Sequence, residues 1–212
     1  MYPVLGSKSQ KVEIKSRRQY DFEALYTKML TKENRMLSDA EVRQLPDSFF
    51  YTMHRQEWKS RADIVYKFID YIKRHKGPKK IMDLKCGTGW LGGRLSQLPE
   101  TEVVAVDHHM NLLEQGAKVF AEEPIRFVYG DIFEPIAELG SFDLIMICDT
   151  LMYFPKIEKL FNRCRLYLEP GGQVRLCENP LYYDYSYLYK PSSFGKFFGE
   201  KKSPFPWIRI VN

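Results

Sequence analysis

The stretch IMDLKCGTGWLGGRLSQLPETEVVAVD, residues 81–107, decides the fold. It places two short apolar runs, IMDL and EVVAVD, on either side of a glycine-rich turn and a segment with helical spacing. A crossover helix joins parallel strands in this way and packs on the sheet that they form. The stretch therefore predicts one strand–helix–strand unit of a parallel sheet.

The same alternation continues along the chain. The further apolar runs are IRFVYG (125–130), FDLIMIC (142–148) and QVRLCE (173–178), and WIRIV near the end is a candidate final strand. The helical segments between them are MNLLEQGAKVF, a short segment around EPIAEL, and KIEKLFNRCRLYL. Strands that alternate with helices predict an α/β fold with a doubly wound, mostly parallel sheet covered on both faces.

The first eighty residues predict an N-terminal helical extension. DFEALYTKML has apolar residues near helical spacing, and LSDAEVRQL begins with Ser38 followed three residues later by Glu41, which is a capping box. A longer helix is expected in RQEWKSRADIVYKFIDYIKRH, with an apolar stripe that starts at Trp58. The tail after residue 178 is rich in Tyr and Phe and broken by Pro and Gly, so its fold is left open.

Composition excludes several classes of protein. The chain has 212 residues, of which 44% are hydrophobic and 28% charged, so it suits one domain with a real core and not global disorder. No apolar run reaches the ~20 residues of a membrane span, and the amino terminus lacks a signal-peptide stretch, so a cytosolic protein is expected. The four scattered cysteines form no C-x-x-C pair, which argues against zinc or a disulfide framework.

Charge is unevenly placed along the chain. Residues 1–80 hold 18 Lys and Arg against 10 Asp and Glu, a balance of +8, whereas residues 81–212 hold 14 against 17, a balance of −3. A basic region of this kind attracts phosphate or nucleic acid, but it is more often a solvated helical face.

Chemistry-bearing residues follow the ends of successive predicted strands. In an open parallel sheet, ligands bind beyond the carboxyl ends of the strands. The first strand is followed by a turn with Gly87 and Gly89, and the second ends in Asp107, a carboxylate suited to the two hydroxyls of a ribose. The other residues at this edge are Asp83, Gly130, Asp131, Ile132, Cys148 and Asp149. Together they predict a nucleoside-binding site.

The glycine turn also matches the dinucleotide pattern G-x-G-x-x-G, ending at Gly92. However, Asp83 just before it would repel a pyrophosphate, and the tail offers no Tyr-x-x-x-Lys pair. A carboxylate at that point suits a cationic group such as the ammonium of an amino acid. The ligand expected is a nucleoside joined to an amino acid, and S-adenosylmethionine fits this description.

At residues 55–180 the sequence resembles the class I S-adenosylmethionine-dependent methyltransferases. The resemblance rests on MDLKCGTGWLGGRL, VVAVDHH, VYGDIF, FDLIMICDTLMYFP and LEPGGQV. It implies that Asp83, Gly87 and Gly89 hold the methionine end of the donor and that Asp107 binds its ribose. It further implies adenine contacts from Asp131 and Ile132, in the turn that begins at Gly130, and from His108, and a methyl-donor pocket lined by Cys148 and Asp149.

The resemblance divides the chain into three parts. Residues 1–54 are expected to form a helical lid or substrate cap, residues 55–180 the donor-binding core, and residues 181–212 a segment that completes the sheet or covers the pocket. One position departs from the family, because Lys85 stands where D-x-G-x-G-x-G has glycine. Its ammonium would lie near the carboxylate of the donor, or, as we favour from the sequence, its stem would run out to solvent.

No catalytic residue follows from the resemblance, because methyl transfer from a sulfonium mainly needs positioning. The candidate bases are Asp149, Tyr153 and His109, and His109 is alternatively an exposed residue at the start of a helix. Glu178 at the end of the fifth strand is a further candidate. A pool of residues for the acceptor pocket is drawn from the helical part and the tail: Tyr51, His54, Trp58, Tyr182, Tyr183, Tyr185 and Tyr187.

The sequence analysis therefore favours methylation of an oxygen or nitrogen of a small molecule, with sugars and other metabolites as candidates. The signatures of amino-methylating DNA enzymes and of cytosine carbon methylation are absent, and no metal site is expected. The alternatives are an RNA or nucleotide methyltransferase, suggested by the basic first part, and a donor-binding protein without catalysis, suggested by Lys85. No membrane partner is expected, and the oligomeric state is left open.

Overall fold

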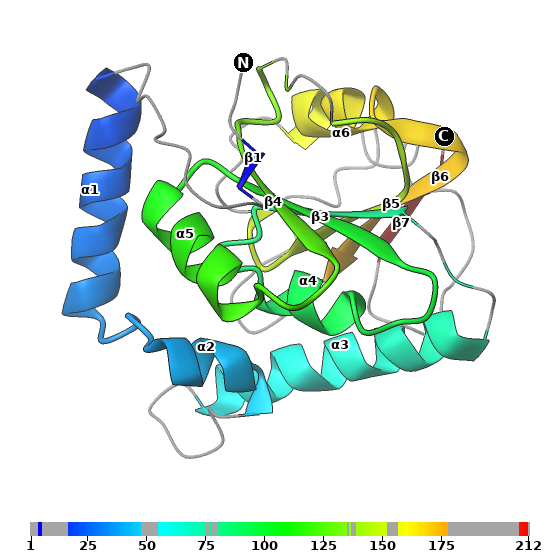
Figure 1. Cartoon of the computed structure of the whole chain (residues 1–212). Helices are drawn as coiled ribbons and strands as arrows, with labels where there is room; N and C mark the ends of the chain where they lie inside the picture. Colours follow the sequence, from blue (N-terminus) through cyan, green and yellow to red (C-terminus); the bar gives the residue numbers. More distant parts are fainter. Residues whose placement is uncertain are drawn as a thin grey trace.

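The computed structural model describes residues 4–5, 17–47, 55–74, 77, 80–134, 136, 139–151, 157–177 and 208–211. These residues contain one sheet with the strand order β1-β4-β3-β2-β5-β6-β7 (Figure 1). The five central strands are parallel, while β1 and β7 pair antiparallel at the two edges. The strands are β1 (Val4–Leu5), β2 (Lys80–Leu84), β3 (Glu102–Asp107), β4 (Ile125–Tyr129), β5 (Phe142–Cys148), β6 (Leu168–Cys177) and β7 (Ile208–Val211).

Six of the predicted helices are confirmed in type and order. They are α1 (Arg17–Lys32), α2 (Asp39–Gln44), α3 (Arg55–Arg74), α4 (Trp90–Leu95), α5 (Met110–Val119) and α6 (Ile157–Arg165). The residues described around EPIAEL, 134, 136 and 139–140, form no helix. Among the helices of the described residues, none combines the length and apolar character that a membrane crossing requires.

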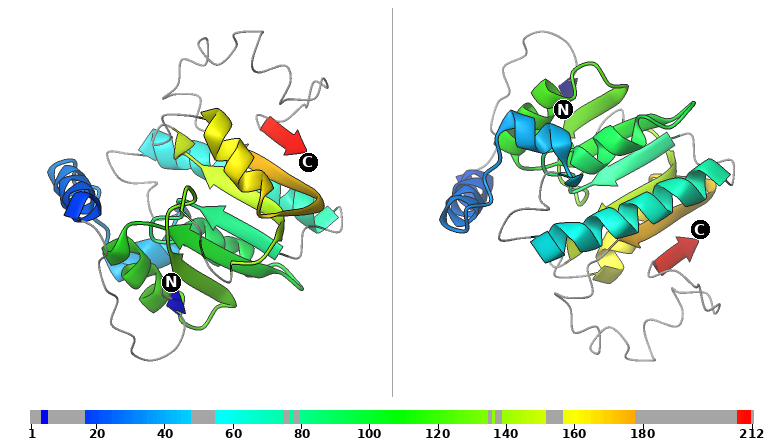
Figure 2. Two further views of the ribbon diagram at one scale, coloured as in Figure 1. Left: turned by 90° about the horizontal axis from the view of Figure 1, so that it is seen from above. Right: turned by 90° about the horizontal axis from the view of Figure 1, so that it is seen from below.

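Helices cover both faces of the sheet, as a largely parallel sheet requires. Figure 2 shows α3 along one face and α6 on the other. The stripe on α3 that begins at Trp58 is buried, and Val65 and Phe68 pack with α4 and with Ile81 and Met146 of the central strands. Alternate residues of the same strands, such as Met82 and Ile145, pack on the opposite face among the buried residues of α6. The alternation of side chains along each strand thus divides the core into two layers.

The N-terminal helices lie at the carboxyl edge of the sheet. The capping box of α2 is present, since the side chain of Ser38 accepts from the amide of Glu41 and the amide of Ser38 donates to the Glu41 carboxylate. α1 stands beside α5 at the rim of the molecule (Figure 1). It is joined to the core by Thr27, whose hydroxyl lies 3.1 Å from Nε2 of His109, and by Glu23, which accepts from the hydroxyl of Tyr129 at 3.1 Å.

One strand prediction needs correction at its start. The fifth predicted strand was placed at 173–178, with a turn at Leu168–Gly172 before it, whereas β6 begins at Leu168. The turn lies inside the strand, because Gly171 has φ +80° and the register with β5 shifts between Phe142 and Leu144. Such a bulge lets one strand carry extra residues without ending the ladder. The strand expected in WIRIV is β7.

Candidate active site

The glycine-rich turn after β2 is built from three left-handed residues. Lys85, Gly87 and Gly89 have φ values of +62°, +56° and +70°. Gly89 tolerates no side chain, because an added Cβ would lie 2.5 Å from the ring of Phe127. At Gly87 the same atom would meet only Leu112, at 4.0 Å, so the turn is open there. Lys85 adopts the conformation that glycine would adopt, at a cost of about 1 kcal/mol.

Asp107 at the end of β3 fastens this turn to the next strand. Its Oδ2 accepts from the amide of Gly87 at 2.8 Å. Its Oδ1 accepts from the amides of His108 and His109 at 2.7 and 3.0 Å. The residue is 5% exposed, so three backbone donors fix the carboxylate at the predicted position.

Asp83 lies in the floor of the same region. It is 2% exposed, and its Oδ2 accepts from the amide of Gly92 at 2.9 Å. Burial raises the pKa of Asp83 to about 7, the Gly92 hydrogen bond opposes the shift, and the nearby charge of Asp107 adds to it. A cation placed beside Asp83 would favour its ionised form, which matches the expected role of this residue toward an ammonium.

Lys85 does not run out to solvent, so that expectation is wrong. Its side chain is 12% exposed, and Nζ lies 2.9 and 3.1 Å from the two ring nitrogens of His108 and 3.7 Å from Oδ1 of Asp107. Burial and the Lys85 ammonium lower the pKa of His108, so the imidazole is neutral and one ring nitrogen accepts from the ammonium. The stem is held inward because it has two polar partners at its end.

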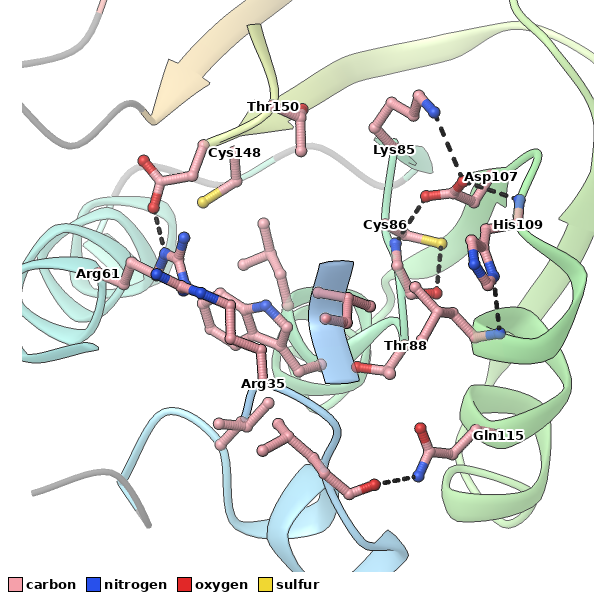
Figure 3. Close-up of a pocket in the computed structure, with 18 of the residues that line it drawn as sticks. Arg35, Arg61, Lys85, Cys86, Thr88, Asp107, His109, Gln115, Cys148 and Thr150 are labelled. Atoms are coloured by element: carbon pink, nitrogen blue, oxygen red, sulfur yellow. Dashed lines mark hydrogen bonds and ion pairs between the residues drawn. The ribbon is translucent and has the colours of Figure 1, made fainter. Parts of the chain in front are cut away.

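A cavity of about 450 Å³ opens at the carboxyl ends of β2, β3 and β5 (Figure 3). Its wall includes seven of the predicted site residues: Asp83, Lys85, Gly87, Asp107, His109, Cys148 and Asp149. Successive loops therefore do meet at one edge, as the parallel strands predict. The other predicted residues, Gly89, His108, Gly130, Asp131 and Ile132, do not line this cavity.

The turn expected to hold an adenine is closed toward the core. Ile132 is 2% exposed and packs among the core residues beside α6. Asp131 uses Oδ1 to accept from the amide of Phe133 at 3.0 Å. A Cβ on Gly130 would lie 2.9 Å from Ile136. The adenine contacts of this turn stay a prediction.

The opposite wall of the cavity comes from the N-terminal helices and carries a chain of ion pairs. NH1 of Arg35 lies 3.0 and 3.1 Å from the two carboxylate oxygens of Glu57, and NH2 of Arg61 lies 2.7 Å from Glu57. Nε of Arg61 donates to Asp149, and the Arg61 guanidinium lies 4.6 Å from the ring centroid of Trp58. Figure 3 shows both arginines across the cavity from Lys85 and Asp107.

The candidate bases are engaged or lie outside the described residues. Asp149 accepts from Arg61, and its backbone has φ +50°. His109 is 3% exposed, so the expectation of an exposed residue is wrong, although it does start a helix: Nδ1 accepts from the amide of Leu112 at 3.4 Å. Both of its ring nitrogens have partners, because Nε2 faces Thr27. Tyr153 and Glu178 lie outside the described residues.

The thiols at the cavity are held neutral. Burial raises the pKa of Cys86 well above its usual value, and the carboxylates of Asp107 and Asp83 add to the shift. A hydrogen bond with Cys177, followed by burial, raises the pKa of Cys148 in the same direction. Because the thiolate is the nucleophilic form, neither cysteine is poised for covalent catalysis.

Sequence reasoning did not single out Arg35, Glu57 or Arg61. Glu57 and Arg61 are four residues apart on one helix, which is the spacing of an intrahelical ion pair and was the available signal. Nothing in the sequence links Arg61 to Asp149, 88 positions away. Of the predicted acceptor pool, Trp58 lines the cavity, while Tyr51, His54 and the tail tyrosines lie outside the described residues.

Comparison with known proteins bears on this geometry. A family model described as a methyltransferase domain matches residues 81–172. Malonyl-[acyl-carrier protein] O-methyltransferase of Halalkalibacterium halodurans is 31% identical over 100 residues, which are 45% of this chain and 37% of that protein. Ribosomal RNA small subunit methyltransferase C of Actinobacillus pleuropneumoniae is 30% identical over 173 residues, which are 77% of this chain and 48% of that protein. The chain thus spans less than half the length of either relative.

The fold has a counterpart among solved structures. The crystal structure of an S-adenosylmethionine-dependent methyltransferase from Clostridium acetobutylicum superposes with a TM-score of 0.50 at 24% identity, covering 60% of this chain and 54% of that one. This likeness concerns the fold. The family model identifies a methyltransferase domain in residues 81–172, and the sheet order is that of the class I methyltransferase fold; the methyl donor of this family is S-adenosylmethionine.

Proposed function

We propose that this protein transfers a methyl group from S-adenosylmethionine to an oxygen or nitrogen of a small molecule. The observation that carries the proposal is the cavity at the carboxyl edge, about 450 Å³ in volume, between the glycine-rich turn and the N-terminal helices. This volume is in the range of small-molecule sites. Its roof is formed by side chains of α1 and of the segment before α2, including Tyr26, Leu30 and Leu37.

The residues of the cavity fit the donor. Asp107 is fixed where it accepts hydrogen bonds from ribose hydroxyls, and Asp83 is a buried carboxyl suited to the ammonium. The open face of Gly87 leaves room for a ligand to approach the backbone. Bound there, the donor would supply an activated methyl group on a sulfonium.

The chain's own contribution to the reaction is to orient and to exclude water. Asp149 and Arg61 hold each other at the end of β5, next to the expected methyl position, so that this edge of the pocket is rigid. Apolar side chains of the roof and Trp58 line this side of the cavity, where they would exclude water from a bound ligand. Methylation of an amine or a carboxylate needs no strong base, which agrees with a site in which the two candidate bases that the structure describes, Asp149 and His109, are engaged.

We include the division of labour predicted from the sequence in this proposal. Residues 1–54 act as the cap of the acceptor pocket, residues 55–180 hold the donor, and residues 181–212 complete the sheet, as β7 does, or cover the pocket. A cytosolic location is part of the same proposal.

RNA or nucleotide methylation is the second candidate, for two reasons. The relative that covers most of the chain, at 77%, is named for ribosomal RNA, and residues 1–80 carry a balance of +8. RNA binding through such a region falls steeply with salt, whereas capture of a small molecule in a closed cavity depends on salt only weakly.

A labelling experiment separates the two candidates. We would incubate the protein with methyl-tritiated S-adenosylmethionine and a cell extract divided into a low-mass fraction and an RNA fraction. Label in the low-mass fraction is expected, and label confined to RNA would establish the second candidate. Calorimetry with S-adenosylhomocysteine accompanies it, because absence of binding would contradict both.

A further inference from the structure

Lys85 occupies a position that the established features of the site leave unexplained. It stands in the donor-binding turn in a left-handed conformation, φ +62°, where a side chain is disfavoured. Its stem does not escape to solvent but turns inward, and only 12% of the side chain is exposed. A side chain that is buried at a ligand site on a strained, left-handed backbone is a candidate for a functional role.

The acceptor capacity of Asp107 shows what the ammonium does there. An ionised carboxylate offers about four lone-pair positions. The amides of Gly87, His108 and His109 take three of them, at 2.7 to 3.0 Å. The ammonium of Lys85 lies 3.7 Å from Oδ1 and is a fourth polar group against this carboxylate.

The two ribose hydroxyls of the donor must also donate to Asp107, and these four groups already occupy most of its acceptor positions. The three amides belong to the turn and to the start of α5, so they cannot withdraw unless the backbone rearranges. The ammonium stands on a flexible four-carbon stem and can swing away. Its other contact, the neutral ring of His108 at 2.9 Å, holds it beside the carboxylate in the meantime.

We propose that Lys85 is a specificity-determining residue of the donor site, whose ammonium competes with the ribose hydroxyls of the donor for Asp107. The inference rests on the proposed function, since it takes Asp107 as the ribose ligand. Donor and product then bind only as the ammonium leaves the carboxylate. Glycine, the residue of the D-x-G-x-G-x-G motif at this position, removes the competitor, so Lys85 weakens retention of the adenosyl group.

Calorimetry with S-adenosylhomocysteine tests the proposal on the full chain. Lys85→Met keeps the stem and removes the ammonium, and we expect it to tighten binding about threefold to thirtyfold, the range that a partly buried ion pair covers. Lys85→Gly should tighten it at least as much. Lys85→Arg, which keeps the charge, should stay near the wild type. The matched control is Lys118→Met, because Lys118 is exposed and pairs with Asp39 away from the cavity.

A second ligand pair distinguishes competition for the ribose from a change in the fold. The same variants would be titrated with adenosine and with 2′,3′-dideoxyadenosine, which lacks both hydroxyls. The gain from Lys85→Met should appear with adenosine and vanish with the dideoxy compound. Weaker or unchanged binding of S-adenosylhomocysteine to Lys85→Met, or an equal gain with both nucleosides, would overturn the proposal. If the wild type and all variants fail to bind S-adenosylhomocysteine, it is the proposed function that fails.

Discussion

The two walls of the cavity are built in different ways. The wall formed by residues 83–109 is held together by two strand-end carboxylates that bind the segment after β2: Asp83 accepts from the amide of Gly92 in α4, and Asp107 accepts from the amide of Gly87 in the turn. The wall formed by α1 to α3 is joined to the core by long-range side-chain contacts, such as Arg61 with Asp149 and Thr27 with His109. The first, the local wall, follows from a short sequence motif. The second, the distant wall, depends on how segments far apart in the sequence meet.

The local wall should give the largest single effect. Asp107→Ala leaves three backbone amides, one buried and two part-buried, without their acceptor and removes the ribose ligand. We expect affinity for S-adenosylhomocysteine to fall about 10- to 100-fold, together with a lower melting temperature. Isothermal titration and thermal unfolding measure the two effects. An unchanged dissociation constant would show that the ribose is bound elsewhere.

A substitution in the distant wall should mainly lower the free energy of unfolding. Arg61→Met removes the guanidinium from Asp149 and from Glu57, which is 4% exposed and keeps its ion pair with Arg35. Breaking a mostly buried ion pair in this way should lower the free energy of unfolding by about 2–4 kcal/mol, as read from urea denaturation. Arg43→Met is the control, since Arg43 is half-exposed and its pair with Glu123 should count for less than about 1 kcal/mol. Equal losses of unfolding free energy in the two variants would show that the ion pairs of Arg61 contribute no more to stability than the pair of the half-exposed Arg43.

The local wall could be predicted because its logic is contained in a short stretch of sequence. The glycines, Asp83 and Asp107 follow strand ends, and parallel strands bring their carboxyl ends to one edge. The direction of the Lys85 side chain was predicted wrongly, because it depends on His108, whose ring accepts a hydrogen bond from the ammonium across the turn. His109 was expected to be exposed, and it is buried because α1 packs its Tyr26 and Thr27 against the ring.

The distant wall could not be predicted, because periodicity gives the buried face of a helix but not its partners. The stripe on α3 identified Trp58 as buried, yet the same helix carries Glu57 and Arg61 at the cavity. Their role follows from where α3 crosses the end of β5, which sets Arg61 beside Asp149. The turn at Gly130–Ile132 is a similar case, since the packing of Ile132 in the core beside Ile136 does not follow from the local sequence.

A dependence of ligand affinity on pH sharpens the account of the local wall. The pKa of Asp83 is raised from 3.8 to about 7, so between these pH values the folded protein holds a proton that the unfolded chain has lost. The contribution of this group to stability is therefore full at low pH and is lost as the pH rises through 7. Binding an ammonium needs the ionised form. Affinity for S-adenosylhomocysteine should therefore fall about tenfold from pH 8 to pH 6.

Asp83→Asn provides the comparison for this prediction. Its affinity should be lower at pH 8 and nearly flat across the same range, because the group that titrates is gone. His108 adds little there, since its pKa is lowered and the ring stays neutral. A profile as steep in the variant as in the wild type would assign the dependence to another group.

The smallest effect is expected at the entrance to α2. Ser38→Ala removes the side chain that accepts from the amide of Glu41 at 3.3 Å and should cost about 1 kcal/mol of stability. The helix lies under the cavity roof, so a small loss of affinity for the acceptor should accompany it, with donor affinity unchanged. Chemical denaturation and donor titration check the two parts. A change in the free energy of donor binding as large as the loss of stability would contradict the view that the two walls are built independently.

The most direct test of the central claim is a crystal structure of the protein with S-adenosylhomocysteine. The account predicts the ribose hydroxyls within hydrogen-bonding distance of Asp107, the amino group at Asp83, and the vacant methyl position facing Asp149 and the helical wall. An adenosyl group bound away from the carboxyl edge of β2 and β3, or a ribose that does not contact Asp107, would contradict it.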